Sequence, residues 1–358
     1  MNKSKYQIIA DDIRSKIITK EFLVGSVIPP EVQLQEDYQV SRHTVRQAIS
    51  VLVNEGYLRK EKGSGTYVEN ALQDNYKKLP NSNVIGVITT YLSDYIFPSI
   101  IRGIEKELRD NGYSLLLAST NNDISQERRC LEQMLEQQVA GLIVEPTKSN
   151  QYNSNLDYYL AIKEQNVPIV MINAAYEELS LPVVCVDDVK GGLVATNHLI
   201  EQGHENLALI TKIDDLQGKY RMKGFIKAHE NAKIKFHSEN IFTYSTETVE
   251  DVLKELLLFL EKNREITGIV CYNDEVAYKL IQNLIENNFR IPDDFSIVGN
   301  DDSVISTAKE IQLTTLSHPK EQLGVMAAKS IISALHGKDI QDQVFEPMLV
   351  VRDSVRKI

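Results

Sequence analysis

The chain has few cysteines, no long apolar run and no apolar N-terminal segment. Its three cysteines, at positions 130, 185 and 271, are too far apart for a CxxC-type zinc or redox site, and their scatter suits a reducing compartment. No stretch approaches the roughly 18 apolar residues of a membrane helix, and the opening MNKSKYQIIADDIR lacks the core of a signal peptide. We therefore expect a cytoplasmic protein with no membrane partner.

The common catalytic and metal-binding motifs are also missing. There is no GxxxxGK[ST], GxSxG, GxGxxG or HExxH, no EF-hand loop, and the seven histidines are scattered. These absences predict no catalytic residues, no metal and no cofactor.

Acidic residues outnumber basic ones over the whole chain, but one segment is locally basic. The net charge is −11, which argues against a basic nucleic-acid-binding protein as a whole. Residues 41–62, however, carry five basic side chains against Glu55 and Glu61: Arg42, Arg46, Arg59, Lys60 and Lys62. The chain is therefore predicted to have one small, locally basic region on an acidic molecule.

Residues 1–69 have the pattern of three helices followed by a hairpin. A capping-box sequence starts at Ser4, Pro29-Pro30 opens a short second helix, and Ser41 is a good N-cap for a third. In the third helix, apolar residues recur at helical spacing from Val45 to Val53. Two short strand-like runs joined by KGSG then complete a winged helix-turn-helix.

The rest of the chain has a different rhythm. Residues 70–83 are polar and aperiodic, which predicts a linker. Residues 84–358 alternate apolar strands with helical segments, the pattern of an α/β domain with parallel sheets. This length favours two doubly wound lobes, which we expect the chain to connect by crossovers near residues 174, 303 and 327.

The third helix is the first candidate site. Its apolar stripe leaves Arg42, His43, Arg46 and Gln47 on the opposite face, where they could reach base edges. The helix N-terminus at Ser41 and Thr44 favours phosphate. A solvated helix face is the alternative, but the short preceding helix and the glycine-rich hairpin with Lys62 favour binding to double-stranded DNA.

The segments IPPEVQL, VSRHTVRQA, LVNEGYL and GSGTYV resemble the GntR-type winged helix over residues 4–69. In that family the start of the recognition helix and the tip of the wing contact DNA. The resemblance implies operator contacts from Ser41, Arg42, Thr44, Arg46, Lys62 and Gly63.

The second candidate site lies in the α/β region, where polar residues follow predicted strands. They are Tyr91, Glu145, Asn173, Asp187, Asp188, Asn273, Asp274, Asp301 and Asp302. Such residues converge on a cleft if two open sheets face each other, and together with Arg221 and Phe97 they favour a small polyol or sugar. Helix N-capping remains the alternative for Asp187, Asp188 and Asp302; metal binding is the weaker rival.

The region from about 84 to 355 resembles the effector domain of LacI/GalR-type repressors, which is related to periplasmic sugar-binding proteins. The resemblance is carried by VIGVI, VDDVKGG, RMKGF, CYNDEVA, IPDDFSIVGND and LTTLSHP. It implies ligand contacts at Phe97, Gln217, Arg221, Asp274 and Asp301. His318 lies in the last of these segments and is a further candidate.

The combination of a GntR-type DNA-binding domain with a LacI-type effector domain is similar to the arabinose-responsive repressors. The segments around Tyr91, Tyr95 and Phe97, around Glu145, and at Asn173 share in this similarity. It implies L-arabinose as effector. We further expect operator DNA as partner and a homodimer formed through the effector domains. Another pentose or hexose fits the residues equally well. An exported sugar-binding receptor would share the large domain but needs a secretion signal, and a sugar-modifying enzyme would need a base or nucleophile in the cleft.

Overall fold

The computed structural model describes residues 4–18, 21–61, 64–69, 83–92, 95–307 and 312–358. The chain forms two compact units, Met1–Pro80 and Asn81–Ile358, which are described separately. Nearly all of the expected linker, residues 70–82, lies outside the described residues, as do the wing-tip candidates Lys62 and Gly63.

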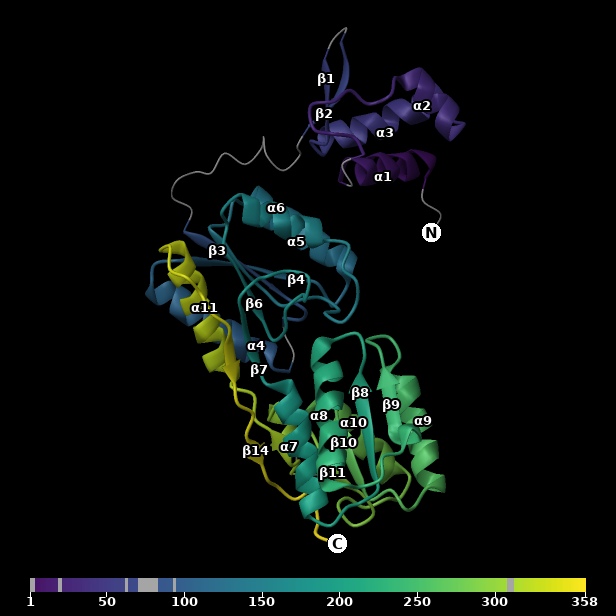
Figure 1. The fold of residues 1–358 in the computed structure, drawn as a ribbon, viewed down its shortest axis with the longest axis vertical. Coiled ribbons are helices and arrows are strands. Elements are labelled where there is room, and N and C mark those ends of the chain that lie inside the picture. Colours follow the sequence, from purple (N-terminus) through teal and green to yellow (C-terminus); the bar gives the residue numbers. More distant parts are fainter. Residues whose placement is uncertain (1–3, 19–20, 62–63, 70–82, 93–94, 308–311) are drawn as a thin grey trace. The chain divides into compact units, whose positions relative to one another are not determined.

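The first unit is a winged helix-turn-helix (Figure 1). Its elements are α1 (Lys5–Ile18), α2 (Glu31–Tyr38), α3 (Arg42–Asn54), β1 (Leu58–Glu61) and β2 (Gly65–Val68). The Gln7 side chain accepts the Ser4 backbone N–H at 3.1 Å, as expected in a capping box. Ser41 Oγ accepts the Thr44 N–H at 3.3 Å and so caps α3. The two strands pair antiparallel, with Leu58 opposite Val68.

This unit has its own apolar core, which the helical periodicity of α3 predicts. The predicted stripe of α3 packs between the other elements, with Val53 only partly buried. The buried residues of this core are Ile9, Ala10, Ile13, Ile28, Leu34, Val45, Ala48, Ile49, Leu52, Leu58 and Val68. The opposite face of α3 is thereby left to solvent.

The second unit contains two α/β lobes, as expected. The first lobe is a six-stranded parallel sheet in the order β13-β7-β6-β5-β3-β4. The strands are β3 (Val84–Thr89), β4 (Ser114–Ser119), β5 (Gly141–Val144), β6 (Ile169–Ile172), β7 (Val183–Val186) and β13 (Gln343–Phe345). The helices are α4 (Phe97–Asp110), α5 (Ile124–Glu136), α6 (Leu156–Glu164) and α11 (Lys320–Leu335).

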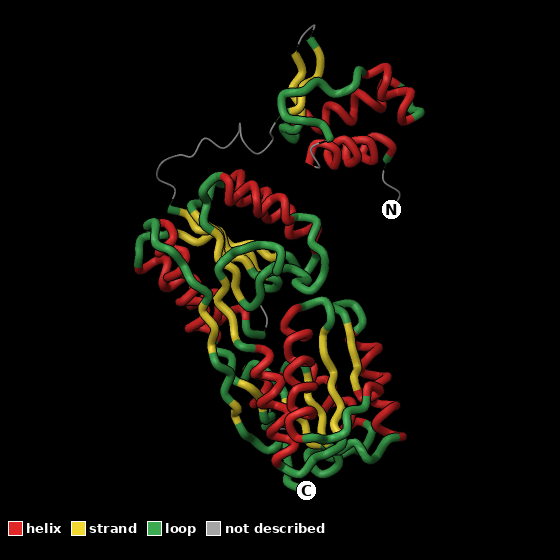
Figure 2. The backbone as a smooth tube through the Cα atoms, in the orientation of Figure 1, coloured by secondary structure: helices red, strands yellow, loops and turns green. Residues whose placement is uncertain are grey.

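The second lobe is a four-stranded parallel sheet in the order β11-β10-β8-β9. The strands are β8 (Leu207–Lys212), β9 (Ile241–Tyr244), β10 (Gly268–Cys271) and β11 (Ser296–Val298), and the helices are α7 (Asp188–Glu201), α8 (Leu216–Ala232), α9 (Val249–Lys262) and α10 (Asp274–Glu286). One core joins the sheet to α9 and α10, and another joins it to α7 and α8. In both lobes the strands lie between layers of helices (Figure 2).

The structure corrects all three expected crossover positions. β7 still pairs with β6, so the first crossover lies at Asp187 and not near 174. The second lies near His318 and not near 303, because Thr314 and Ser317 bridge to the second lobe before α11 packs on α4. The third lies between β13 and β14 (Leu349–Val350), which pairs with β12 (Thr315–Leu316), and not near 327. Helices and strands alternate in the same way in both lobes, so the sequence does not mark where the chain changes sheet.

The crossovers gather at one edge of each sheet. β13 and β7 form one edge of the first sheet and β11 one edge of the second, and these strands adjoin the crossing segments. The opposite edges are β4 and β9. The carboxyl ends of the remaining strands face the space between the lobes.

Candidate functional site

The exposed face of α3 carries the predicted DNA-binding side chains. Ser41, Arg42, His43, Arg46 and Gln47 are exposed, and Thr44 is half-buried. A depression beside the N-terminus of the helix is lined by Lys5, Gln35, Gln39, Val40, Ser41 and Thr44. This face has the donors that base edges and phosphates accept.

Sequence reasoning missed the partner that orients the two arginines. Glu31, the first residue of α2, accepts hydrogen bonds from Nε of Arg42 at 3.0 Å and from Nε of Arg46 at 2.9 Å. Burial alone would raise the pKa of Glu31, but the hydrogen bonds from the arginines outweigh burial and lower it. Glu31 therefore holds both guanidinium groups side by side; no signal in the sequence pairs these residues.

A pocket of ≈ 570 Å³ lies between the two lobes of the second unit. It has the size of a small-molecule site. Ten of the eleven predicted effector residues line it: Tyr91, Tyr95, Phe97, Glu145, Asn173, Gln217, Arg221, Asn273, Asp301 and His318. They come from both lobes, because the ends of strands in the two sheets face each other here.

Asp274 is the exception and is not among the lining residues. It is fully buried, and its carboxylate accepts hydrogen bonds from Thr315 Oγ1 at 2.5 Å and from the Ser303 N–H at 2.7 Å. The ligand contact expected at Asp274 therefore stays a prediction: Asn273 caps α10, and the Asp274 side chain bonds to Thr315 and Ser303 within the second lobe. Burial, followed by the charge of Asp301, raises the pKa of Asp274 to about 7.

Arg221 lies at the centre of a buried ion-pair network. Its Nε donates to Asp188 at 2.8 Å, its Nη2 lies 3.6 Å from Asp301, and its guanidinium carbon lies 4.9 Å from the ring centroid of Tyr272. Asp187 is the residue that caps α7, by accepting the Lys190 N–H at 2.9 Å. The helix-capping alternative therefore holds for Asp187, while Asp188 faces the pocket.

The loop that carries Asp301 is held in an unusual conformation. Asp301 and Asp302 both have positive φ, 103° and 43°. Lys320 Nζ donates to both of their carbonyl oxygens, at 2.6 and 2.9 Å, and Tyr95 of the first lobe donates its hydroxyl to Asp301 Oδ2 at 2.7 Å. These bonds fix the direction of the Asp301 carboxylate.

Three pocket residues have buried polar atoms without a hydrogen-bond partner among the described residues: Asn173 Oδ1, Gln217 Oε1 and His318 Nδ1. Burial lowers the pKa of His318 to about 4, so its ring is neutral near neutral pH. Buried polar atoms are rarely left unpaired, and unpaired acceptors at the wall of a cavity suit the hydroxyl groups of a ligand.

Further residues of the pocket escaped sequence reasoning, Lys212 and Asp215 among them. Lys212 ends β8, and its Nζ lies 2.6 Å from Asp215; both line the pocket. The pattern that predicts ligand-binding residues here is an acid or amide after a strand, and a lysine at the end of β8 does not fit that pattern. Glu145 accepts from the Thr90 N–H at 2.9 Å, the Thr90 hydroxyl at 2.6 Å and Asn173 Nδ2 at 2.7 Å.

The chemistry of this wall suits a small polyol. Burial raises the pKa of Glu145, against the hydrogen bonds it accepts. The rings of Tyr91 and Phe97 meet edge to face, with centroids 5.7 Å apart, and supply an apolar surface next to the polar groups.

Among the described residues no three His, Cys, Asp or Glu side chains are grouped so that they could hold a metal ion. Nor does that part of the chain contain a helix long and apolar enough to cross a membrane.

Comparison with known proteins matches each of the two units to a protein family. Residues 5–68 match the model of bacterial regulatory proteins of the gntR family, and residues 196–355 match the periplasmic binding protein-like domain. The chain is 47% identical to the arabinose metabolism transcriptional repressor of Halalkalibacterium halodurans, over 98% of this chain and 96% of that protein. It is 44% identical to the protein of the same name from Geobacillus stearothermophilus, over 99% and 98% of the two chains.

A solved structure shows the same fold. The transcriptional regulator CelR in its cellobiose complex superposes with a TM-score of 0.67, at 21% sequence identity, over 88% of this chain and 92% of that one. The family is one of transcription regulators and not of enzymes, and it joins DNA binding by the winged helix to sugar binding by the lobes. The chain thus belongs to the arabinose metabolism transcriptional repressors, and in it a gntR-family winged helix precedes a periplasmic binding protein-like domain.

Proposed function

We propose that this chain represses genes of arabinose metabolism in the cytoplasm and is released from its operator by L-arabinose. The observation that carries the proposal is the identity of 47% over nearly the whole length to a repressor of that metabolism. The pocket supports it, because its unpaired polar atoms and its carboxylates can each take a sugar hydroxyl.

Operator contacts are proposed for the exposed side of α3 and for the wing. The residues are Ser41, Arg42, His43, Thr44, Arg46, Gln47, Lys62 and Gly63. The first six are supported by their positions on or at the start of α3, on the side that does not pack in the core. A homodimer formed through the lobes would present two such surfaces to an operator with two related half-sites.

Effector contacts are proposed for the residues that line the pocket. They are Tyr91, Tyr95, Phe97, Glu145, Asn173, Gln217, Arg221, Asn273, Asp301 and His318, joined by Lys212 and Asp215. Another pentose or a hexose remains the second candidate, because the ≈ 570 Å³ pocket leaves room for either.

The test is fluorescence anisotropy of a labelled DNA fragment from upstream of the protein's own gene, at fixed salt, with a panel of pentoses and hexoses. We expect tight binding that L-arabinose alone relieves. Gln217→Leu should bind the same DNA without responding to the sugar, because it removes an unpaired pocket acceptor at nearly constant volume. Release by another sugar would reassign the effector, and folded protein that binds no operator fragment would refute the proposal.

A further inference from the structure

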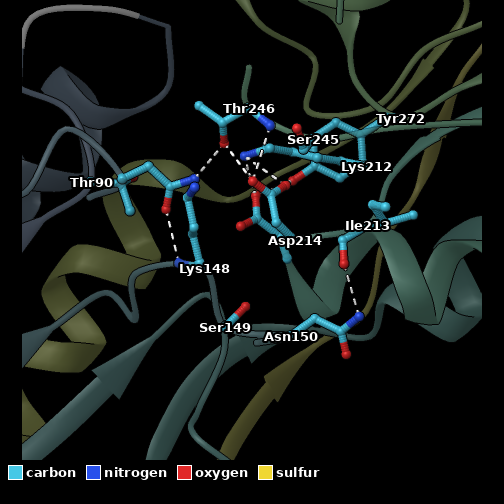
Figure 3. Close-up of polar contacts among 12 residues, drawn as sticks. Thr90, Lys148, Ser149, Asn150, Lys212, Ile213, Asp214, Ser245, Thr246 and Tyr272 are labelled. Atoms are coloured by element: carbon cyan, nitrogen blue, oxygen red, sulfur yellow. Dashed lines mark hydrogen bonds and ion pairs between the residues drawn. The ribbon is translucent and has the colours of Figure 1, made fainter. Parts of the chain in front are cut away.

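One contact between the two lobes lies beside the pocket, where Asn122 and Thr246 belong to its wall, and away from the crossovers. We call this contact the cross-cleft latch. It consists of Asn122, Lys148, Ser149 and Asn150 of the first lobe and Ile213, Asp214, Leu216, Thr246 and Glu247 of the second. Figure 3 shows its centre, with the Asn150 amide turned towards the Ile213 carbonyl.

Asn150 and its neighbour make one half of the latch. The Asn150 side-chain amide donates to the Ile213 carbonyl at 2.9 Å, and its backbone N–H donates to the Asp214 carbonyl at 3.0 Å. Ser149 Oγ accepts the Leu216 N–H at 2.9 Å. A short segment of the first lobe therefore binds the loop that follows β8.

Lys148 and Asn122 make the other half. Lys148 Nζ lies 2.6 Å from Glu247 Oε1, and Asn122 Nδ2 donates to Thr246 Oγ1 at 2.8 Å. The Asn122 side chain also accepts the Lys148 N–H at 2.9 Å, which ties the two first-lobe loops together. Both halves join groups that would separate if the lobes opened.

The latch lies at the sheet edges that are farthest from the crossovers. Asn122 follows β4, while Thr246 and Glu247 follow β9, and β4 and β9 are the edge strands farthest from the crossovers in their sheets. A rotation about the crossovers moves these edges more than it moves the floor of the pocket. Opening the lobes therefore breaks the hydrogen bonds and the ion pair of the latch before the floor of the pocket moves far.

The latch and the pocket wall share one segment of chain. Lys212 and Asp215 line the pocket, and Asp214 between them belongs to the latch. Asp214 is fully buried, and its Oδ2 accepts both the Thr246 N–H at 3.0 Å and the Thr246 hydroxyl at 2.7 Å. A ligand that fixes Lys212 and Asp215 thus also fixes the loop that the first lobe grips.

We infer that the cross-cleft latch, whose residues Asn122 and Thr246 reach the pocket wall while Lys148, Asn150 and Glu247 do not line the pocket, sets the affinity of the pocket for its sugar. Its residues are positioning residues: they stabilise the closed arrangement in which both walls reach the ligand, and the apparent affinity scales with the population of that arrangement. The inference relies on the proposed function for the identity of the ligand. The effect on lobe closure does not depend on that identity.

The inference is tested with three single variants of the full-length chain: Lys148→Met, Glu247→Gln and Asn150→Ala. The control variant is Glu255→Gln, on the exposed side of α9. For each single variant we expect L-arabinose to bind about threefold more weakly, the size of effect that one exposed ion pair or neutral hydrogen bond gives. Lys148→Met with Glu247→Gln should be no weaker than either single change, because both remove the same pair. Lys148→Met with Asn150→Ala should be about tenfold weaker, because these bonds are separate.

Lobe closure is measured independently of sugar, as the distance between two spin labels. The labels are attached to cysteines introduced at the exposed positions Lys163 of α6 and Lys254 of α9. The chain without these two cysteines serves as the labelling blank. Latch variants should shift the sugar-free distances to longer values than in Glu255→Gln. Unchanged distances in folded variants would overturn the inference, and so would longer distances with unchanged sugar affinity. A wild-type chain that binds no L-arabinose would refute the proposed effector, yet the distances would still test the latch.

Discussion

At the scale of single residues, burial decides what a polar side chain does. Asp274 and Asp301 both follow strands of the second lobe, and sequence alone treats them alike. In the structure Asp301 faces the pocket, whereas Asp274 is enclosed by Thr315 and Ser303. The predicted residues that line the pocket could be found because strand ends converge, but the direction of each side chain depends on packing that no local pattern encodes.

Asp274 predicts a pH dependence of stability. Its pKa is about 7 in the folded chain and near the ordinary value of 3.8 when unfolded, so between these values the folded state holds a proton that the unfolded state has lost. Relative to Asp274→Asn, the wild type should lose up to about 1.4 kcal/mol of unfolding free energy per pH unit as pH rises through this window. Urea unfolding followed by circular dichroism at pH 5, 6, 7 and 8 measures this. Parallel curves for the two proteins would show that the carboxyl group does not titrate as described.

Arg46 belongs to the DNA-binding surface, where Glu31 holds it beside Arg42. If Arg46 reads a base, Arg46→Ala should weaken operator binding by about 1–3 kcal/mol and relax the preference at one position of each half-site. Anisotropy titrations with a set of single-base operator variants test this, and L-arabinose affinity serves as the control that must not change. An equal loss on every variant would leave Arg46 as a phosphate contact.

At the scale of elements, the helices of each lobe cross where glycines face each other. A Cβ added at Gly192 of α7 would lie 2.0 Å from the Arg221 carbonyl oxygen of α8, and one added at Gly224 of α8 would lie 2.2 Å from the Val189 carbonyl oxygen of α7. Such close backbone contact requires glycine at the crossing. The crossing also places Arg221 opposite Asp188, so the pocket network depends on how closely the two helices pack.

Gly192→Ala should therefore force α7 and α8 apart. We expect the lobes to lose about 1–3 kcal/mol of stability, the usual cost of overpacking, and to bind sugar more weakly because Arg221 moves. Gly191→Ala is the matched control, since its added Cβ would meet nothing closer than Asn300 Oδ1 at 3.7 Å. Urea unfolding and sugar titration of both variants decide the matter; equal stabilities would mean that the helices adjust without cost.

Most elements follow from their sequence patterns, but the connections between lobes do not. The alternation of apolar strands and helices predicts β3 to β8 closely, because parallel strands buried on both faces have continuous apolar runs. The strands β9, β12, β13 and β14 are not predicted from the sequence; β13 is short, and its central residue Val344 is exposed. Since β13 closes the edge of the first sheet, missing it also misplaced the last crossover.

At the scale of the whole molecule, the two units have separate cores. Ile13 and Leu52 are buried within the winged helix, and each lobe has its own buried cluster. A ligand stabilises only the part of a protein that binds it. Sugar and DNA should therefore protect different units against unfolding.

Calorimetry of the full chain should show this separation as two transitions. L-arabinose at about 100 times its Kd should add about 2.7 kcal/mol to the stability of the lobes and raise their Tm, while the transition of the winged helix stays in place. Gln217→Leu provides the control without ligand response. A single transition that shifts as a whole would mean that the two units unfold together.

The repeated crossing of the chain also has a consequence for the order of events on the ribosome. The first lobe is complete only when α11 and β13 have been made, and the second needs Ser354 and Ile358, whose groups bond to Ile297 and Gln202. The winged helix, by contrast, has all its strands by Val68. During synthesis the winged helix can thus fold first, and the lobes acquire their ligand-binding form only after the chain has been made as far as Ile358.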